Sequence, residues 1–190
     1  MAERTKKQEI LEAAAELFRD KGYSATSMRD LAQAVHLQAS SLYNHIQSKQ
    51  EILREICFAN ARRFLAGITA IEAEYATATE RVRALLELHI QVAVQDFTSI
   101  TSFNDEWRHL DAPALEEFMT LRRAYEQRFI GIIQAGIEAG EFKAVEPRIA
   151  LYTLLSSIRW VYDWFKPNQR LTIDDVRASV QQLLLSGLSR

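Results

Sequence analysis

Residues 26–49 read TSMRDLAQAVHLQASSLYNHIQSK, and the interpretation of the whole chain starts from them. Their apolar side chains recur at helical spacing and predict two short amphipathic helices joined by a tight turn at residues 35–38. The side chains expected to pack these helices together are Leu31, Ala34, Leu37, Leu42 and Ile46. Hydroxyl, amide and imidazole groups gather on the second helix, and a helix in the major groove of B-DNA can bring such groups to base edges and phosphates. The stretch therefore indicates a helix-turn-helix that contacts DNA.

Helical periodicity begins before this stretch. The first buried face is formed by Ile10, Ala13, Ala14, Leu17 and Phe18. Gly22 stands where the C-terminal glycine of a helix belongs. Thr26 and Ser27 offer an N-cap for a second helix that runs to Ala34, and a third short helix fits residues 39–45. From periodicity alone, an ordinary helical hairpin with its polar side in solvent is the alternative interpretation.

Longer helices follow the short ones. Ser48 and Glu51 have the spacing of a capping box, which opens a long helix ending near Tyr75. Further helices are expected over residues 79–97, 111–140, 147–166 and from 172 onward. Few glycines and prolines interrupt the chain, so we expect an all-α fold of about nine helices, three short and about six longer.

The basic residues near these helices suggest phosphate contacts. Arg4, Lys6 and Lys7 precede the first helix and could form a basic arm. The helix that starts at Ser48 presents a positive dipole end with Lys49 beside it, an arrangement that suits a phosphate group.

Composition restricts the other functions. The chain has 190 residues and a formal net charge of −2, so DNA contact must come from a local patch and not from the overall field. The single cysteine, Cys57, cannot form an intramolecular disulfide. The N-terminus is polar and unlike a signal peptide, and no apolar run approaches the ~20 residues needed to span a bilayer. We expect no membrane association and a cytoplasmic location.

The sequence does not suggest an enzyme. Its one Glu-x-x-His motif, Glu106 to His109, is too little for a di-iron site, which needs two such motifs and two further carboxylates. Zinc-ligand spacing and a glycine-rich phosphate loop are both missing, so no metal and no cofactor are expected. Cys57 lies among apolar residues, which favours a buried structural thiol over a redox sensor.

The segment from Ile10 to Leu53 resembles the DNA-binding domain of the tetracycline-repressor (TetR) family. The resemblance is carried by AAAELFRDKGYSATSMRDLA and SSLYNHIQSKQEIL, which agree in register from Gly22 to Leu53. It implies a small three-helix DNA-binding domain, here residues 1–47, joined to a larger helical domain, residues 48–190, that binds an effector and dimerises.

The resemblance also implies roles for single residues. Thr26, Tyr43, His45 and Lys49 would contact phosphates, which set register without reading sequence. The full set of expected DNA-binding residues is Thr26, Arg29, Gln38, Ala39, Ser40, Ser41, Tyr43, Asn44, His45 and Lys49. Of these, Gln38, Ala39, Ser40 and Asn44 would lie nearest to base edges. The chain departs from the family pattern at His36, where glycine is common, and at Gln38, where Ser or Thr often caps the recognition helix. Histidine tolerates a left-handed backbone conformation better than most residues, so the turn of the motif can still form with His36.

Two aromatic segments, residues 97–110 and 159–166, suggest an effector site between helices. The candidates are Phe103, Trp107, Arg108, Arg159, Trp160 and Trp164. Ordinary core packing is the alternative for the aromatic residues. For Arg159 the alternatives are an anionic ligand group and an ion pair with Asp163 one turn later. The ending WFKP, with Trp107 and Arg108 upstream, resembles a branch of the family that responds to acyl-coenzyme A thioesters.

The last two helices, 146–165 and 172–188, can form a four-helix bundle with a symmetry mate, although they could also close the core of one subunit. We therefore expect a homodimeric transcriptional repressor that binds a near-palindromic operator and is released by a small, largely apolar effector such as an acyl-coenzyme A thioester. Another hydrophobic effector is the first alternative. A helical adaptor that binds only protein is the second, and it would leave Tyr43, His45 and Lys49 without a role.

Overall fold

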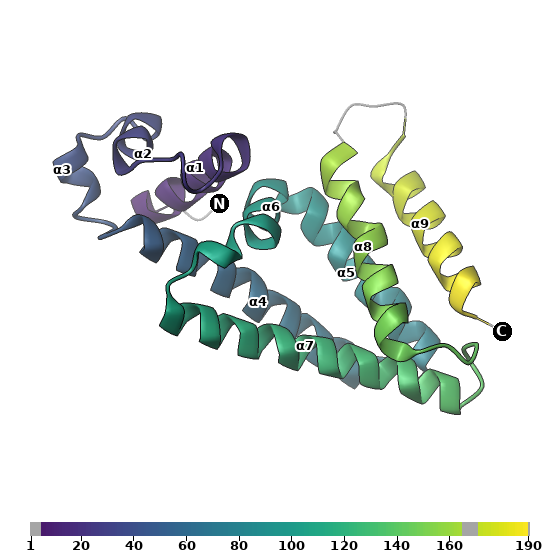
Figure 1. Ribbon diagram of the computed structural model, residues 1–190. Helices are drawn as coiled ribbons and strands as arrows, with labels where there is room; N and C mark the ends of the chain where they lie inside the picture. Colours follow the sequence, from purple (N-terminus) through teal and green to yellow (C-terminus); the bar gives the residue numbers. More distant parts are fainter. Residues whose placement is uncertain (1–4, 165–170, 190) are drawn as a thin grey trace. The chain divides into compact units, whose positions relative to one another are not determined.

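The computed structural model describes residues 5–164 and 171–189. The elements are α1 (Lys6–Lys21), α2 (Met28–Ala34), α3 (Ala39–Leu42), α4 (Lys49–Glu74), α5 (Ala78–Gln95), α6 (Phe97–Asp105), the 3-10 helix η1 (Trp107–His109), α7 (Ala112–Glu138), α8 (Pro147–Trp164) and α9 (Ile173–Leu188). These described residues contain nine α-helices and no strand, which confirms the all-α prediction (Figure 1). None of these helices is long and apolar enough to cross a membrane.

The chain divides into two compact units. The first unit comprises residues up to 62 together with 96–120, and the second comprises 63–95 together with 121 onward. The long helices α4 and α7 contribute to both units. The boundary expected between residues 47 and 48 separates a DNA-binding domain from an effector domain by function, not by packing. It stays a prediction.

The first helices begin and end where local hydrogen bonding satisfies their free backbone groups. The Thr5 and Ser27 side chains cap α1 and α2, each in a reciprocal capping box with the residue three positions later, Gln8 and Asp30. Gly22 ends α1 with φ 84°, ψ 153°, and its N–H donates to the Phe18 carbonyl. The predicted cap at Ser27 and the predicted glycine terminator are both confirmed.

Replacing Gly22 by alanine should lower the free energy of unfolding by about 1–3 kcal/mol, because this backbone region is nearly restricted to glycine. The cost would come from the backbone alone, since an added Cβ would lie 3.8 Å from its nearest neighbour, Oε1 of Glu106. Gly131→Ala in the middle of α7 is the matched control. Its Cβ would meet nothing within 4 Å, and the helix should gain about 0.5–1 kcal/mol. Chemical denaturation of both variants tests this, and shifts of the same sign would contradict it.

In the first unit, α6 packs against α1 (Figure 1). The Ser102 hydroxyl is buried and donates to the Ala15 carbonyl at 3.2 Å. Nη1 of Arg19 donates to the Thr98 hydroxyl at 3.4 Å. These bonds join α1, which precedes the helix-turn-helix, to a segment that follows α5 in the sequence.

In the second unit, α5 packs against α8 and α9 (Figure 1). The turn after α7 caps the start of α5, because the Glu141 carboxylate accepts hydrogen bonds from the Ala78 and Thr79 backbone and from the Thr79 hydroxyl. Arg177 of α9 forms an ion pair with Glu87 of α5 at 2.7 Å.

A buried histidine lies in the core of the second unit. Nε2 of His89 is 2.8 Å from the Tyr125 hydroxyl, and its imidazole stacks on Phe64 with ring centroids 4.4 Å apart. Burial lowers the pKa of His89 from 6.5 to about 4. The apolar surroundings disfavour the charged imidazolium, so the folded protein holds this side chain neutral at physiological pH.

This histidine should make the protein less stable in mild acid. Below pH 6.5 the unfolded chain binds a proton that the folded state refuses until about pH 4. The contribution of neutral His89 to the free energy of unfolding is therefore fully present at pH values well above 6.5. It falls by about 2 kcal/mol as the pH drops from 7 to 5. The difference in unfolding free energy between the wild type and His89→Gln, measured at both pH values, isolates this effect. A difference that does not change with pH would contradict it.

Candidate nucleic-acid interface

The second half of the helix-turn-helix presents a polar face to solvent. The residues of this region that are exposed are Gln38, Ala39, Ser40, Tyr43, Asn44 and His45, and Ser41 is half-buried. Leu42 and Ile46 are fully buried beneath them. Tyr43 is 44% exposed, so its ring and hydroxyl are accessible from solvent. The buried pair anchors α3, so the side chains expected to meet DNA are the accessible ones.

The turn before α3 depends on a left-handed residue. His36 has φ 55°, the one positive φ among the non-glycine residues that the structure describes. The Leu37 N–H then donates to the Ala32 carbonyl at 2.8 Å and closes the turn. Histidine thus occupies the position where the family often has glycine, as expected. Gln38 stands at the N-cap of α3 without a side-chain capping bond.

Lys49 is held by the loop between α1 and α2. Its Nζ donates to the carbonyls of Tyr23 and Thr26, each at 2.7 Å, and lies 4.2 Å from the centre of the Tyr23 ring. This ammonium therefore fastens the start of α4 to the loop. The phosphate contact predicted for Lys49 would have to use its third N–H.

Thr26 is turned inward. Its side chain is buried, and its hydroxyl donates to the Gly22 carbonyl at 2.9 Å. Its N–H donates to the Tyr23 carbonyl at 3.2 Å. The phosphate contact predicted for Thr26 would require these groups to exchange partners, whereas Arg29 on α2 is exposed.

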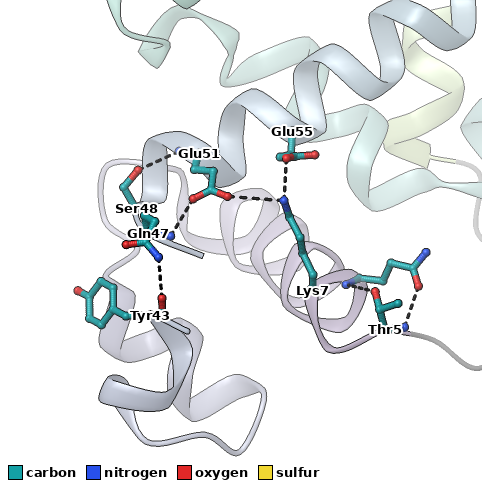
Figure 2. Close-up of polar contacts among 8 residues, drawn as sticks. Thr5, Lys7, Tyr43, Gln47, Ser48, Glu51 and Glu55 are labelled. Carbon is teal, nitrogen blue, oxygen red and sulfur yellow. Dashed lines mark hydrogen bonds and ion pairs between the residues drawn. The ribbon is translucent and has the colours of Figure 1, made fainter. Parts of the chain in front are cut away.

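A network of polar contacts joins α3, α4 and α1 (Figure 2). The Ser48 hydroxyl accepts from the Glu51 N–H at 3.1 Å, as a capping box predicts. The Glu51 carboxylate, however, accepts from the Gln47 N–H at 2.7 Å and not from Ser48, which corrects the expected reciprocal bond. Nε2 of Gln47 donates to the Tyr43 carbonyl at 2.8 Å.

The basic residues of α1 are neutralised within the chain. Lys7 pairs with Glu55 at 2.8 Å and with Glu51 at 3.6 Å, and hydrogen bonding to Glu55 raises the pKa of Lys7 (Figure 2). Lys6 pairs with Glu9 at 2.6 Å. The expected basic arm thus has two of its cations engaged, and Arg4 lies outside the described residues.

The effector candidates of the first unit belong to an aromatic cluster centred on Phe118. The rings of Phe103 and Trp107 lie 5.6 and 5.9 Å from that of Phe118, with Phe58 at 6.2 Å. Arg108 is exposed, and its guanidinium lies 4.5 Å from the centre of the Trp107 ring. This packing is what the core alternative predicts for Phe103 and Trp107, and their contact with an effector stays a prediction.

The remaining effector candidates lie in the second unit. Arg159 of α8 is exposed. The side chains of Trp160, Asp163 and Trp164 lie outside the described residues, so neither the tryptophan site nor the Arg159–Asp163 ion pair is resolved.

A junction that sequence reasoning missed ties η1 to α4 and to the loop between α1 and α2, inside the first unit. The Gln50 side-chain amide donates to the His109 carbonyl at 2.6 Å and accepts from the Asp111 N–H at 3.2 Å. The His109 imidazole stacks on the Tyr23 ring with centroids 5.2 Å apart and lies 3.4 Å from the Glu106 carboxylate. A glutamine near the start of a helix gives no sequence signal for such a role, and Gln50 is half-buried.

No group of three or more His, Cys, Asp or Glu side chains is placed to hold a metal ion in the part of the chain that the structure describes. Cys57 is fully buried, and burial raises its thiol pKa to about 12. A thiol in this environment is a poor nucleophile, because the reactive thiolate is strongly disfavoured.

Comparison with known proteins agrees with this geometry. The model of "Bacterial regulatory proteins, tetR family" matches residues 10–56, and that of "Tetracyclin repressor-like, C-terminal domain" matches residues 75–188, more than half of the chain. The HTH-type transcriptional repressor KstR2 of Rhodococcus jostii is 27% identical over 191 residues, covering 97% of this chain and 91% of the relative.

Two solved structures share the fold. The ketosteroid transcriptional regulator KstR2 of Mycobacterium tuberculosis has a TM-score of 0.92 at 22% identity, covering 99% of this chain and 97% of that one. AibR, crystallised with isovaleryl coenzyme A and operator DNA, has a TM-score of 0.84 at 25% identity, covering 95% and 98%. The chain therefore belongs to the TetR family of bacterial regulatory proteins, helix-turn-helix proteins that regulate transcription.

Proposed function

We propose that this protein is a homodimeric repressor that binds a near-palindromic operator and is released from it by an acyl-coenzyme A thioester. The observation that carries the DNA-binding part is the exposed polar face of residues 38–45, held over the buried side chains of Leu42 and Ile46. Hydroxyl, amide and imidazole groups on such a face suit base edges and phosphates in the major groove.

Exposed apolar side chains on the last two helices support the dimer. Ile149 and Leu183 are 67% and 73% exposed, and Tyr152 is 43% exposed. Large apolar side chains on two neighbouring helices are what an isologous four-helix bundle would cover. Such a dimer would present two copies of α3 to successive major grooves, or to grooves separated by a multiple of that distance.

Charge and relatives support the effector class. Arg108 and Arg159 are exposed, and guanidinium groups bind phosphate well. AibR, which has the same fold, was crystallised with isovaleryl coenzyme A. The proposed site would lie within one unit, where an exposed arginine would meet the phosphates and the apolar acyl group would enter the helical core of that unit.

Contacts inside the first unit offer a route from effector to DNA. Ser102, Thr98 and the backbone at 109–111 hydrogen-bond to α1 and α4. A shift of α6 and η1 on effector binding would therefore move α1, which packs on α2, and α4, which follows the DNA-contacting residues 38–45. Effector and operator would oppose each other through one coupling free energy, typically ~1–3 kcal/mol.

The experiment is thermal unfolding of the protein with a panel of acyl- and aryl-coenzyme A thioesters, the matching free acids and coenzyme A alone. A thioester at ~100 times its dissociation constant should add about 2.7 kcal/mol, a shift of several degrees. The same thioester should weaken DNA binding. Equal shifts with thioester and free acid, or no shift with any thioester, would contradict the effector assignment and leave the DNA-binding part intact.

A further inference from the structure

Glu51 of α4 is connected to the recognition segment, residues 39–46, by two consecutive hydrogen bonds through Gln47 (Figure 2). The first runs from the Gln47 N–H to the Glu51 carboxylate at 2.7 Å. The second runs from the Gln47 side chain to the Tyr43 carbonyl at 2.8 Å. Gln47 therefore has both its backbone and its side chain fixed, one toward α4 and the other toward the end of α3.

The same carboxylate also contacts α1. Oε1 of Glu51 lies 3.6 Å from Nζ of Lys7, which pairs at 2.8 Å with Glu55 one turn further along α4. Glu51 thus joins α4 to two other parts of the first unit, because it meets α1 through Lys7 and the recognition segment through Gln47. Glu55 meets only α1 among these contacts.

Electrostatics alone would not favour a carboxylate here. A negative charge beside the DNA-contacting face repels the phosphate backbone, and Lys7 offsets it only in part. The location at the start of α4 gives the carboxylate a compensating contribution, since a helix N-terminus favours negative charge and has unpaired N–H groups.

Resting on the proposed function, we infer that Glu51 is a positioning residue for operator recognition. It does not touch DNA but sets the angle at which Tyr43, Asn44 and His45 leave the scaffold. A loss of this carboxylate should therefore reduce discrimination between operator and unrelated DNA, while the removal of its charge alone should strengthen binding to any DNA.

Three variants separate these effects. Glu51→Ala removes the charge and the acceptor for Gln47, Glu51→Gln removes the charge but keeps an oxygen acceptor, and Glu55→Ala removes one charge from the same helix without touching Gln47. The probes are a duplex enriched from a random library by the wild-type protein and a scrambled duplex of the same length. Thermal unfolding is recorded for each variant, and hydrogen exchange is followed at the backbone amides of residues 43–47.

We expect Glu51→Ala to bind the enriched duplex about tenfold more weakly, the size expected when a hydrogen bond to a charged group is lost. Its binding to the scrambled duplex should be equal or stronger, and its amides 43–47 should exchange faster. Glu51→Gln should recover most of the discrimination, and Glu55→Ala should keep all of it. If Glu51→Ala does not fold, the comparison of Glu51→Gln with Glu55→Ala still tests the inference. Glu51→Gln should then lose some discrimination between the two duplexes, less than expected for Glu51→Ala, and Glu55→Ala should lose none.

Equal behaviour of all three variants toward both duplexes, with unchanged exchange at residues 43–47, would overturn the inference and leave only a charge effect. The failure of the proposed function would look different, because the wild-type protein would then enrich no duplex. In that case the exchange rates still decide whether Glu51 holds the recognition segment.

Discussion

Leu183→Glu should convert the protein to a monomer and weaken operator binding by about 100-fold or more, because a dimer on two half-sites gains on the order of 10²–10⁴ in avidity over one subunit. Leu183 is 73% exposed on α9, the most exposed large apolar side chain among the described residues. A charge there would be buried without a partner in the proposed bundle, which is strongly unfavourable. Sedimentation equilibrium and fluorescence anisotropy with labelled duplex measure the two effects.

The control is Ala66→Glu, which adds the same charge at an exposed position of α4. It should leave the oligomeric state and the operator affinity of the wild type unchanged. A Leu183→Glu protein that remains dimeric, or a wild type that is monomeric at micromolar concentration, would contradict the assignment of α8 and α9 to the dimer interface.

Phe118→Ala should lower the free energy of unfolding by about 3–5 kcal/mol, the usual cost of removing a buried phenylalanine. Phe118 is 1% exposed. Three aromatic side chains, Phe58, Phe103 and Trp107, surround it, so the cavity left by alanine would be lined by rings that cannot easily fill it. Denaturant unfolding followed by circular dichroism gives the change directly.

Tyr43→Ala is the matched comparison, since it removes an aromatic ring of similar size from the surface of the same unit. It should change stability by no more than about 0.5 kcal/mol, while it weakens DNA binding through the lost phosphate contact. If Phe118→Ala costs less than about 1 kcal/mol, the cluster is not a packed core and Phe103 and Trp107 would be open to an effector.

The positions of the short helices could be predicted because local chemistry determines them. Ser27 caps α2, Gly22 ends α1 at a backbone conformation that suits only glycine, and His36 adopts the left-handed turn. Each of these signals depends on one residue and its immediate neighbours. The buried pair Leu42 and Ile46 likewise follows from helical periodicity.

Side-chain partners could not be predicted in the same way. Lys49 donates to carbonyls at residues 23 and 26, and the Thr26 hydroxyl donates to residue 22. These groups were expected to contact phosphates, but a lysine or threonine near a loop can choose among several acceptors. Only the folded positions of the carbonyls decide the choice. For the same reason, the Glu51 carboxylate accepts from the Gln47 N–H and not from the expected Ser48 N–H, one residue later.

Helix α6 and the buried His89 gave weak signals. Residues 97–102 read FTSITS, in which Thr and Ser have low helix propensity, and Asp96 starts the helix by accepting from the Ser99 N–H. The packing of α6 against α1 provides the stabilisation that its low helix propensity does not. His89 lies at helical spacing from Leu85 and Leu86, on the buried face of α5. The sequence does not show its hydrogen-bond partner, Tyr125, which lies far along the chain and satisfies the buried imidazole.

The most direct test of the central claim is the salt dependence of binding to a duplex that the wild-type protein enriches from a random library. The account predicts a near-palindromic sequence whose affinity falls by at least about tenfold between 50 and 200 mM salt, because phosphate contacts release counterions. Failure to enrich any sequence, or an affinity that does not change with salt, would contradict the assignment of residues 38–45 as a DNA-binding surface.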